Sequence, residues 1–184
     1  MNALLEMPSV AQADGNSRRL VERTFVSHDG VELFYRAWLP ERVTRAVVLF
    51  HRGHEHSGRW AEFVEKLGMP DAAVFAWDAR GHGRSPGERG WAADFATVVK
   101  HADAFVSHLC AEYGVAVEDV AVVAHSVGAV AAAAWVHGYA PPIRAMVLAT
   151  PAFEVKLYVP LAIPSLRALS VVKKKAFVKS GATR

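Results

Sequence analysis

The stretch VAVVAHSVGAV, residues 120–130, contains the most informative pattern in the chain. A short apolar run stops at His125-Ser126-Val127-Gly128, and an alanine-rich run follows. This pattern predicts a strand, a sharp turn and a helix, with Ser126 at the apex. Such a turn is the setting of a nucleophile elbow, which exposes a serine hydroxyl at the end of a parallel sheet. The alternative is an ordinary loop serine between two apolar elements.

Short apolar runs and helical runs alternate on both sides of this stretch. Two alternating runs, 22–27 and 31–38, flank His28-Asp29-Gly30 and predict a β-hairpin. Short apolar runs predict strands at 45–50, 72–77, 120–124 and 143–149, of which the first is expected to be buried on both faces and the second to be buried as well. Helical spacing predicts helices at 59–67, 95–113 and 127–136. The order predicts an α/β fold, with an N-terminal hairpin followed by a parallel sheet that carries helices on both faces.

Three loops of unusual composition follow predicted strands, at 51–58, 78–87 and 125–128. Ligands of open parallel sheets bind at the carboxyl ends of the strands. We therefore expect the three loops to converge on one site.

Composition and charge limit the classes of protein to which this chain can belong. The chain has 184 residues, enough for one sizeable core, and a single cysteine, which excludes an internal disulfide framework. From Pro151 onward there are seven Lys or Arg residues and one acidic residue, so the net charge of +3 is a C-terminal feature. It does not predict nucleic-acid binding. The sequence has neither a secretory signal pattern nor an apolar run of about 20 residues, so we expect a cytoplasmic protein.

Three motifs resemble those of the α/β-hydrolase superfamily, in its monoglyceride lipase-like or serine aminopeptidase-like (S33) branch. They are HRGHEHSGRW at 51–60, DARGHGRSPGERG at 78–90 and AHSVG at 124–128, and the resemblance runs from about Val21 to Pro151. Arg52 and His54 stand where the family prefers glycine. The first of them lies beside the position of the oxyanion hole.

The resemblance implies a serine hydrolase of carboxylic esters, such as monoacylglycerols or other lipid-like acyl esters, that works through an acyl-enzyme on Ser126. It also implies that the backbone N–H groups of Gly53 and Val127 form the oxyanion hole, a role that suits donors fixed before the charge develops. No cofactor is expected. His54 and His56 are a weak ligand pattern, so no metal is expected either. Asp78, His51 and His82 are expected to order loops.

The general base and the acid of a catalytic triad are the difficulty. In this fold they follow the serine in the order acid, then histidine. After Ser126 the sequence has no Asp, one Glu (Glu154) and one His (His137). His137 is eleven residues along the predicted helix, roughly 16 Å away at 1.5 Å per residue, and Glu154 follows the wrong strand. We therefore expect base and acid to be absent, as in a family member truncated after the start of its cap, with the C-terminal strands missing.

Two alternatives to an active esterase stay open. One is a catalytically dead fragment or interaction scaffold, and the other is an aminopeptidase-type peptidase of the same branch. Acyl esters and aminoacyl arylamides would separate the esterase from the peptidase.

Three regions are predicted along the chain: a flexible lead-in at 1–19, the hydrolase core at 20–151, and the beginning of a cap with a basic tail at 152–184. The apolar and basic stretch at 161–175 is either a cap helix with a solvated basic edge or a peripheral membrane contact. The strand at 143–149 would leave a bare sheet edge, through which self-association is expected.

Overall fold

The computed structural model describes residues 18–153. The fold begins with the predicted hairpin, formed by β1 (Arg19–Val26) and β2 (Glu32–Leu39). The connecting turn closes through a hydrogen bond from the N–H of Gly30 to the carbonyl of Ser27, 3.0 Å long. The Asp-Gly signal in the sequence therefore predicted the hairpin and its place. The hydrogen-bonded turn has His28 and Asp29 at its centre, followed by Gly30.

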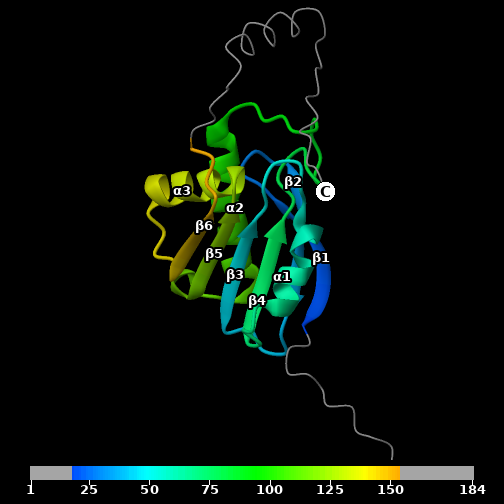
Figure 1. The fold of residues 1–184 in the computed structure, drawn as a ribbon, viewed down its shortest axis with the longest axis vertical. Helices are drawn as coiled ribbons and strands as arrows, with labels where there is room; N and C mark the ends of the chain where they lie inside the picture. Colours follow the sequence, from blue (N-terminus) through cyan, green and yellow to red (C-terminus); the bar gives the residue numbers. More distant parts are fainter. Residues whose placement is uncertain (1–17, 154–184) are drawn as a thin grey trace, which may run out of the picture. The chain divides into compact units, whose positions relative to one another are not determined.

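Four parallel strands complete a six-stranded sheet (Figure 1). They are β3 (Arg45–Phe50), β4 (Ala72–Trp77), β5 (Val120–His125) and β6 (Ala145–Ala149). The strand order is β1-β2-β4-β3-β5-β6, and β2 pairs antiparallel with β4. The predicted α/β fold is confirmed. The strand order brings the carboxyl ends of β3, β4 and β5 together at one end of the sheet.

Helices cover both faces of the sheet, as predicted (Figure 1). They are the 3-10 turn η1 (Ser57–Trp60) with α1 (Ala61–Lys66), α2 (Phe95–Tyr113), the 3-10 turn η2 (Val117–Asp119) and α3 (Val127–Tyr139). The first predicted helix, 59–67, is thus a 3-10 turn that continues as a short α-helix. The helix α3 runs three residues beyond its predicted end and closes with Ala140, whose N–H donates to the carbonyl of Val136.

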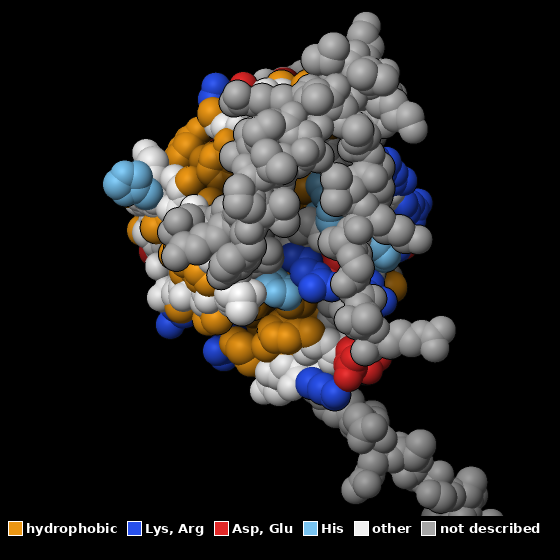
Figure 2. Space-filling view, turned by 45° about the horizontal axis from the view of Figure 1, so that its top comes forward, with side chains coloured by type: hydrophobic (Ala, Val, Ile, Leu, Met, Phe, Trp, Pro, Cys, Tyr) orange, Lys and Arg blue, Asp and Glu red, His pale blue; other side chains and the backbone are white. Residues whose placement is uncertain are grey.

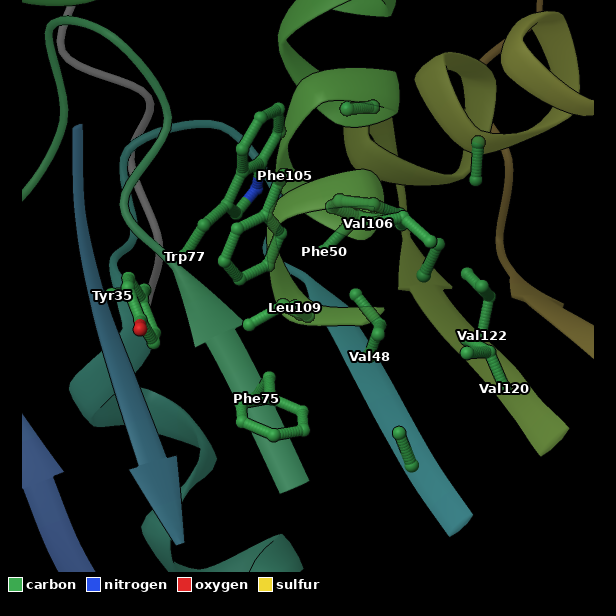
Figure 3. Close-up of a cluster of buried hydrophobic side chains, with 14 of the residues drawn as sticks. Tyr35, Val48, Phe50, Phe75, Trp77, Phe105, Val106, Leu109, Val120 and Val122 are labelled. Carbon is green, nitrogen blue, oxygen red and sulfur yellow. The ribbon is translucent and has the colours of Figure 1, made fainter. Parts of the chain in front are cut away.

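The core has two parts because the sheet is covered on both sides. The larger part lies between the sheet and α2 with α3, and Figure 3 shows Phe105 and Leu109 of α2 packed over Phe75 and Trp77 of β4. The smaller part lies under α1. Each fully buried side chain of this kind stabilises the fold by about 1.5–3 kcal/mol. Burial on both faces explains why β4 reads as an uninterrupted apolar run.

The sheet ends at β6 among the described strands, where Val147 is 56% exposed. The predicted cap and membrane-contacting stretch lie outside the described residues, as does nearly all of the predicted lead-in. In the part that the structure does describe, no helix has the length and apolar character needed to cross a bilayer.

Candidate active site

Ser126 occupies the sharp turn that the sequence predicts between β5 and α3. Its backbone lies at φ 54° and ψ −118°, in the left-handed half of conformational space that side chains other than glycine avoid. The Ser126 N–H donates to the carbonyl of Ala149 (2.9 Å), and its carbonyl accepts from the N–H of Val130 (3.1 Å). The end of β6 and the first turn of α3 therefore hold a conformation that costs about 1–3 kcal/mol.

Gly128 explains how α3 begins so close to the sheet. A Cβ atom at this position would lie 2.5 Å from the carbonyl oxygen of His51 and 2.8 Å from that of Phe50. Real side chains do not approach backbone atoms so closely, so a larger residue here would push the helix away from the end of β3. The elbow pattern requires a small residue at position 128 because α3 passes so close to the end of β3.

Gly53 and Val127, the predicted oxyanion-hole residues, are neighbours in space. A Cβ atom at Gly53 would lie 3.8 Å from Cγ1 of Val127, an ordinary van der Waals contact. The loop after β3 and the first residue of α3 thus meet beside Ser126. Their backbone N–H groups stay candidates for the oxyanion hole, on the basis of this adjacency and the resemblance.

Asp78 fixes the loop after β4 from inside, as predicted. It is fully buried, and its carboxylate accepts from the backbone N–H groups of Ser57 (2.6 Å) and Arg84 (2.8 Å). Gly83 has a φ of 49°, and a Cβ there would lie 2.0 Å from Oδ2 of Asp78. Two loops are therefore tied to one buried charge.

His51 joins the same two loops from the other side. Its Nε2 accepts from the N–H of Ala79 (3.0 Å), so its Nδ1 carries the proton and donates to the carbonyl of Arg52 (2.7 Å). Burial lowers the pKa of His51 to about 4, which keeps the ring neutral near pH 7. His82 similarly uses Nδ1 toward the carbonyl of Arg80 (3.0 Å). Both histidines order loops, as the sequence predicted.

A general base for Ser126 is not found among residues 18–153. His137 lies in the last turn of α3, whereas Ser126 precedes its first turn, so the helix separates the two by roughly 16 Å. Within the described residues, the Ser126 hydroxyl has no hydrogen bond to a histidine side chain. Glu154 lies outside the described residues.

Two cavities flank the elbow. The apolar cavity, of about 320 Å³, lies on the side of α2 and α3, and its walls include Val127, Trp77, Trp91, Phe95 and Val98. The charged cavity, of about 600 Å³, lies on the side of α1, and its walls include His125, Arg52, Glu55, Arg59 and Trp60.

Neighbouring residues of the chain face different cavities. His125 lines the charged cavity and Val127 the apolar one, so Ser126 stands between them. In the loop after β3, His51 lines the apolar cavity and Arg52 the charged one. Figure 2 shows hydrophobic, histidine and Lys or Arg side chains side by side on this face of the molecule. Sequence reasoning missed this division, because side-chain directions at the ends of strands do not follow from spacing.

Comparison with known proteins agrees with this geometry. Residues 41–184 match the family model described as serine aminopeptidase, S33. The chain belongs to this family of α/β-hydrolases. It is 50% identical over 167 residues to YnbC of Escherichia coli K12, covering 90% of this chain and 28% of that protein. It is 33% identical over 137 residues to a monoacylglycerol lipase of Mycolicibacterium smegmatis, covering 71% of this chain and 46% of the lipase.

Among solved structures, the monoacylglycerol lipase of Paleococcus ferrophilus is similar, with a TM-score of 0.59 and 26% sequence identity. The match covers 79% of this chain and 53% of that one. The chain thus spans about half of each lipase, and 28% of the E. coli relative. The likeness supports a hydrolase of the α/β fold.

Proposed function

We propose that this hydrolase cleaves carboxylic esters through an acyl-enzyme on Ser126. The observation that carries the proposal is the backbone of Ser126 between β5 and α3. Its φ of 54° and ψ of −118° lie outside the left-handed helical region in which Ala140 ends α3, and strained conformations of this kind cluster at active sites. In the first step, the Ser126 oxygen attacks the ester carbonyl and its proton passes to a general base. The bond to the alcohol then breaks, and the alcohol leaves with a proton. Water hydrolyses the acyl-enzyme in the second half of the cycle.

The negative charge on the carbonyl oxygen would be met by the backbone N–H groups of Gly53 and Val127. Fixed backbone donors are effective here because they need no reorganisation when the charge develops. The general base and the acid are assigned to none of the described residues. A base supplied from elsewhere is therefore part of the proposal.

The proposed substrates are monoacylglycerols or similar lipid-like acyl esters. Two relatives in the comparison are monoacylglycerol lipases by name. The apolar cavity beside Val127 supports this choice, because its volume of about 320 Å³ and its aromatic walls suit an acyl chain. An ester held in this way would place its chain on the side of α2 and α3.

A peptidase that removes N-terminal residues is the second candidate, favoured by the description of the matching family model. The two candidates differ in the leaving group, an alcohol in one case and an amine in the other. Rates on an acyl ester and on an aminoacyl arylamide, measured with the same preparation, separate them. An esterase turns over the first and leaves the second intact.

Labelling with a fluorophosphonate probe tests whether Ser126 is activated. We expect labelling of the chain that disappears in Ser126→Ala and persists in Ser107→Ala, because Ser107 is an exposed serine of α2. Circular dichroism of all three proteins verifies that they are folded. A folded chain that resists the probe would favour the scaffold alternative, in which the elbow survives as architecture alone.

Self-association through the outer edge of β6 is a further proposal. The edge is a candidate because β6 pairs with β5 alone among the described strands, and unpaired strand edges tend to pair with other chains. Sedimentation velocity over a range of protein concentrations tests it. A monomer at every concentration contradicts it.

A further inference from the structure

We propose that His28, Asp29 and His101 form a binding site for a divalent transition metal ion of the zinc class. The first two residues lie in the turn between β1 and β2, and His101 lies in the second turn of α2. One ligand atom from each of the three side chains lies within 4.8 Å of the other two. Two imidazole nitrogens and a carboxylate oxygen are a donor set that suits zinc, whereas magnesium and calcium take oxygen donors. The fold thus gathers a zinc-type donor set on elements other than those that hold Ser126.

The spacing of the three side chains fits one ion. Nε2 of His101 lies 3.4 Å from Oδ1 of Asp29. Two ligand atoms of a tetrahedral zinc ion are about 3.3 Å apart at bond lengths of about 2.0–2.1 Å. The ring centres of His28 and His101 are 5.0 Å apart. Two imidazoles on one such ion have their ring centres about 5 Å apart, so a small movement of the exposed His28 completes the set and leaves a fourth position for water.

Two of the three ligands are already held in place. His101 is only 1% exposed, so its packing in α2 fixes the ring. The carboxylate of Asp29 is held through both of its oxygens: Oδ2 lies 3.0 Å from Nη1 of Arg80, and Oδ1 accepts from the N–H of Val31 at 3.4 Å. Outer partners of this kind orient the ligands of metal sites. The third ligand, His28, is exposed and leaves a path by which an ion can enter.

A network of ion pairs is the alternative explanation of these contacts. In that case Asp29 serves only as the partner of Arg80 and of His101. The network gives no role to His28, which takes part in neither pair and makes one long contact elsewhere, 3.4 Å from Nδ1 to the hydroxyl of Ser27. A metal ion accounts for all three side chains.

A bound ion would join the hairpin turn to α2. His101 and Arg80 also line the apolar cavity, so the ion would fix one wall of that cavity. The pattern around His54 and His56, which predicts no metal, does not bear on this cluster. His101 follows His28 at a long distance in the sequence, and only the fold brings them together.

Zinc binding to the whole chain tests the proposal. The chain is treated with EDTA and then freed of the chelator, and isothermal titration calorimetry measures its binding of zinc chloride and of magnesium chloride. We expect one equivalent of zinc to bind and no heat of binding from magnesium, because imidazole nitrogen is a poor donor for magnesium. The melting temperature should rise with zinc, because the ion binds a site that exists only in the folded chain.

His28→Gln and Asp29→Asn are the decisive variants, because both residues are exposed and the core is left intact. Each should weaken zinc binding at least about tenfold, since the loss of an outer partner of a ligand alone weakens metal binding about ten- to hundredfold. Each should also remove the rise in melting temperature. His137→Gln is the matched control, because it removes another exposed histidine, from α3, and it should bind zinc as the wild type does. Circular dichroism verifies that all the variants are folded.

The proposal is overturned if the folded wild-type chain does not bind zinc, or if it binds magnesium equally well. It is also overturned if His28→Gln and Asp29→Asn bind zinc as the wild type does. A loss of binding in His54→Gln instead would place the ion in the loop after β3 and would reject the site. None of these measurements depends on ester hydrolysis, so zinc binding through His28 supports the site whether or not Ser126 reacts with the fluorophosphonate probe.

Discussion

The loops after β3 and β4 lie side by side at the carboxyl ends of the strands. One is held by a buried carboxylate, and the other turns charged side chains toward a cavity. The loop at 78–90 is built around Asp78, whose side chain is fully buried. The loop at 51–58 turns Arg52 and Glu55 toward a cavity. We infer that the buried carboxylate of the first loop determines the shape of the site, whereas the charged side chains of the second are open to a ligand.

The loop at 51–58 nevertheless depends on the loop at 78–90 for its position. The N–H of Ser57 donates to Asp78, and His51 accepts from the N–H of Ala79. Both bonds cross from one loop to the other, so the position of Arg52 depends on hydrogen bonds in which its own side chain takes no part. Substitutions should therefore divide into those that damage the shape and those that change only the ligand.

The largest effect is expected from Asp78→Ala. The change leaves the buried N–H of Ser57 and the part-buried N–H of Arg84 without their acceptor, so we expect a loss of about 4 kcal/mol in unfolding free energy. Urea denaturation measures it. Asp71→Ala removes an exposed carboxylate that pairs with Arg45 and should cost far less, because solvent screens such a pair. Equal losses in the two variants would contradict the structural role of the buried charge.

Gly128→Ala should cost about 3 kcal/mol, because the new Cβ would clash with the carbonyl oxygens of His51 and Phe50. Gly138→Ala is the control in the same helix. No atom lies within 4 Å of a Cβ at that position, so we expect it to stabilise α3 by about 0.5–1 kcal/mol. Thermal unfolding measures the change in stability of each variant. Changes of the same sign in both would contradict the close packing of α3 against the end of β3.

The pH dependence of stability tests the neutral ring of His51. Its pKa falls from 6.5 to about 4 on folding, so protonation favours the unfolded chain. The stability that this site contributes is complete above pH 6.5 and is lost as the pH falls toward 4, by about 2 kcal/mol at pH 5.

His51→Gln keeps an acceptor for Ala79 but cannot be charged. The unfolding free energy of this variant should therefore fall less steeply between pH 7 and pH 5 than that of the wild type, as followed by urea denaturation at each pH. His137→Gln, at an exposed position of α3, should keep the wild-type slope. A slope in His51→Gln equal to that of the wild type would refute the link between protonation of His51 and unfolding.

The smallest effect on stability is expected from Arg52→Gln. Its ion pair with Glu55 is half-exposed, and such pairs contribute at most about 1 kcal/mol. We expect the melting temperature to change by no more than about 4 °C, measured by differential scanning calorimetry. A loss as large as that of Asp78→Ala would mean that both loops are structural, and the contrast between them would disappear.

Much of the fold follows from the sequence. Continuous apolar runs predicted β3 and β4, because strands buried on both faces need apolar side chains at every position. The apolar run before Ser126 predicted β5, whose residues alternate between buried and half-buried. The Asp-Gly turn predicted the hairpin, and the small residues around Ser126 predicted the elbow. These signals are local, so one segment is sufficient to reveal each of them.

The two cavities could not be predicted in this way. They arise because Arg52 and His51, adjacent in the chain, face different sides, and because α2 and the loop at 78–90 approach Val127 from a distance in sequence. Motifs report which residues gather at a site. The direction of each side chain depends on strand order and on the packing of helices, which spacing does not encode.

The strand order also has a consequence for synthesis. β3 lies between β4 and β5, and the second of these partners begins seventy residues after β3 has ended. On a ribosome, β3 therefore waits with one edge unpaired, and such long-range pairing is slow to form. The Ser126 turn is completed only when the carbonyl of Ala149 is available. A nascent chain that has not yet reached Ala149 therefore lacks the acceptor that completes the turn at Ser126.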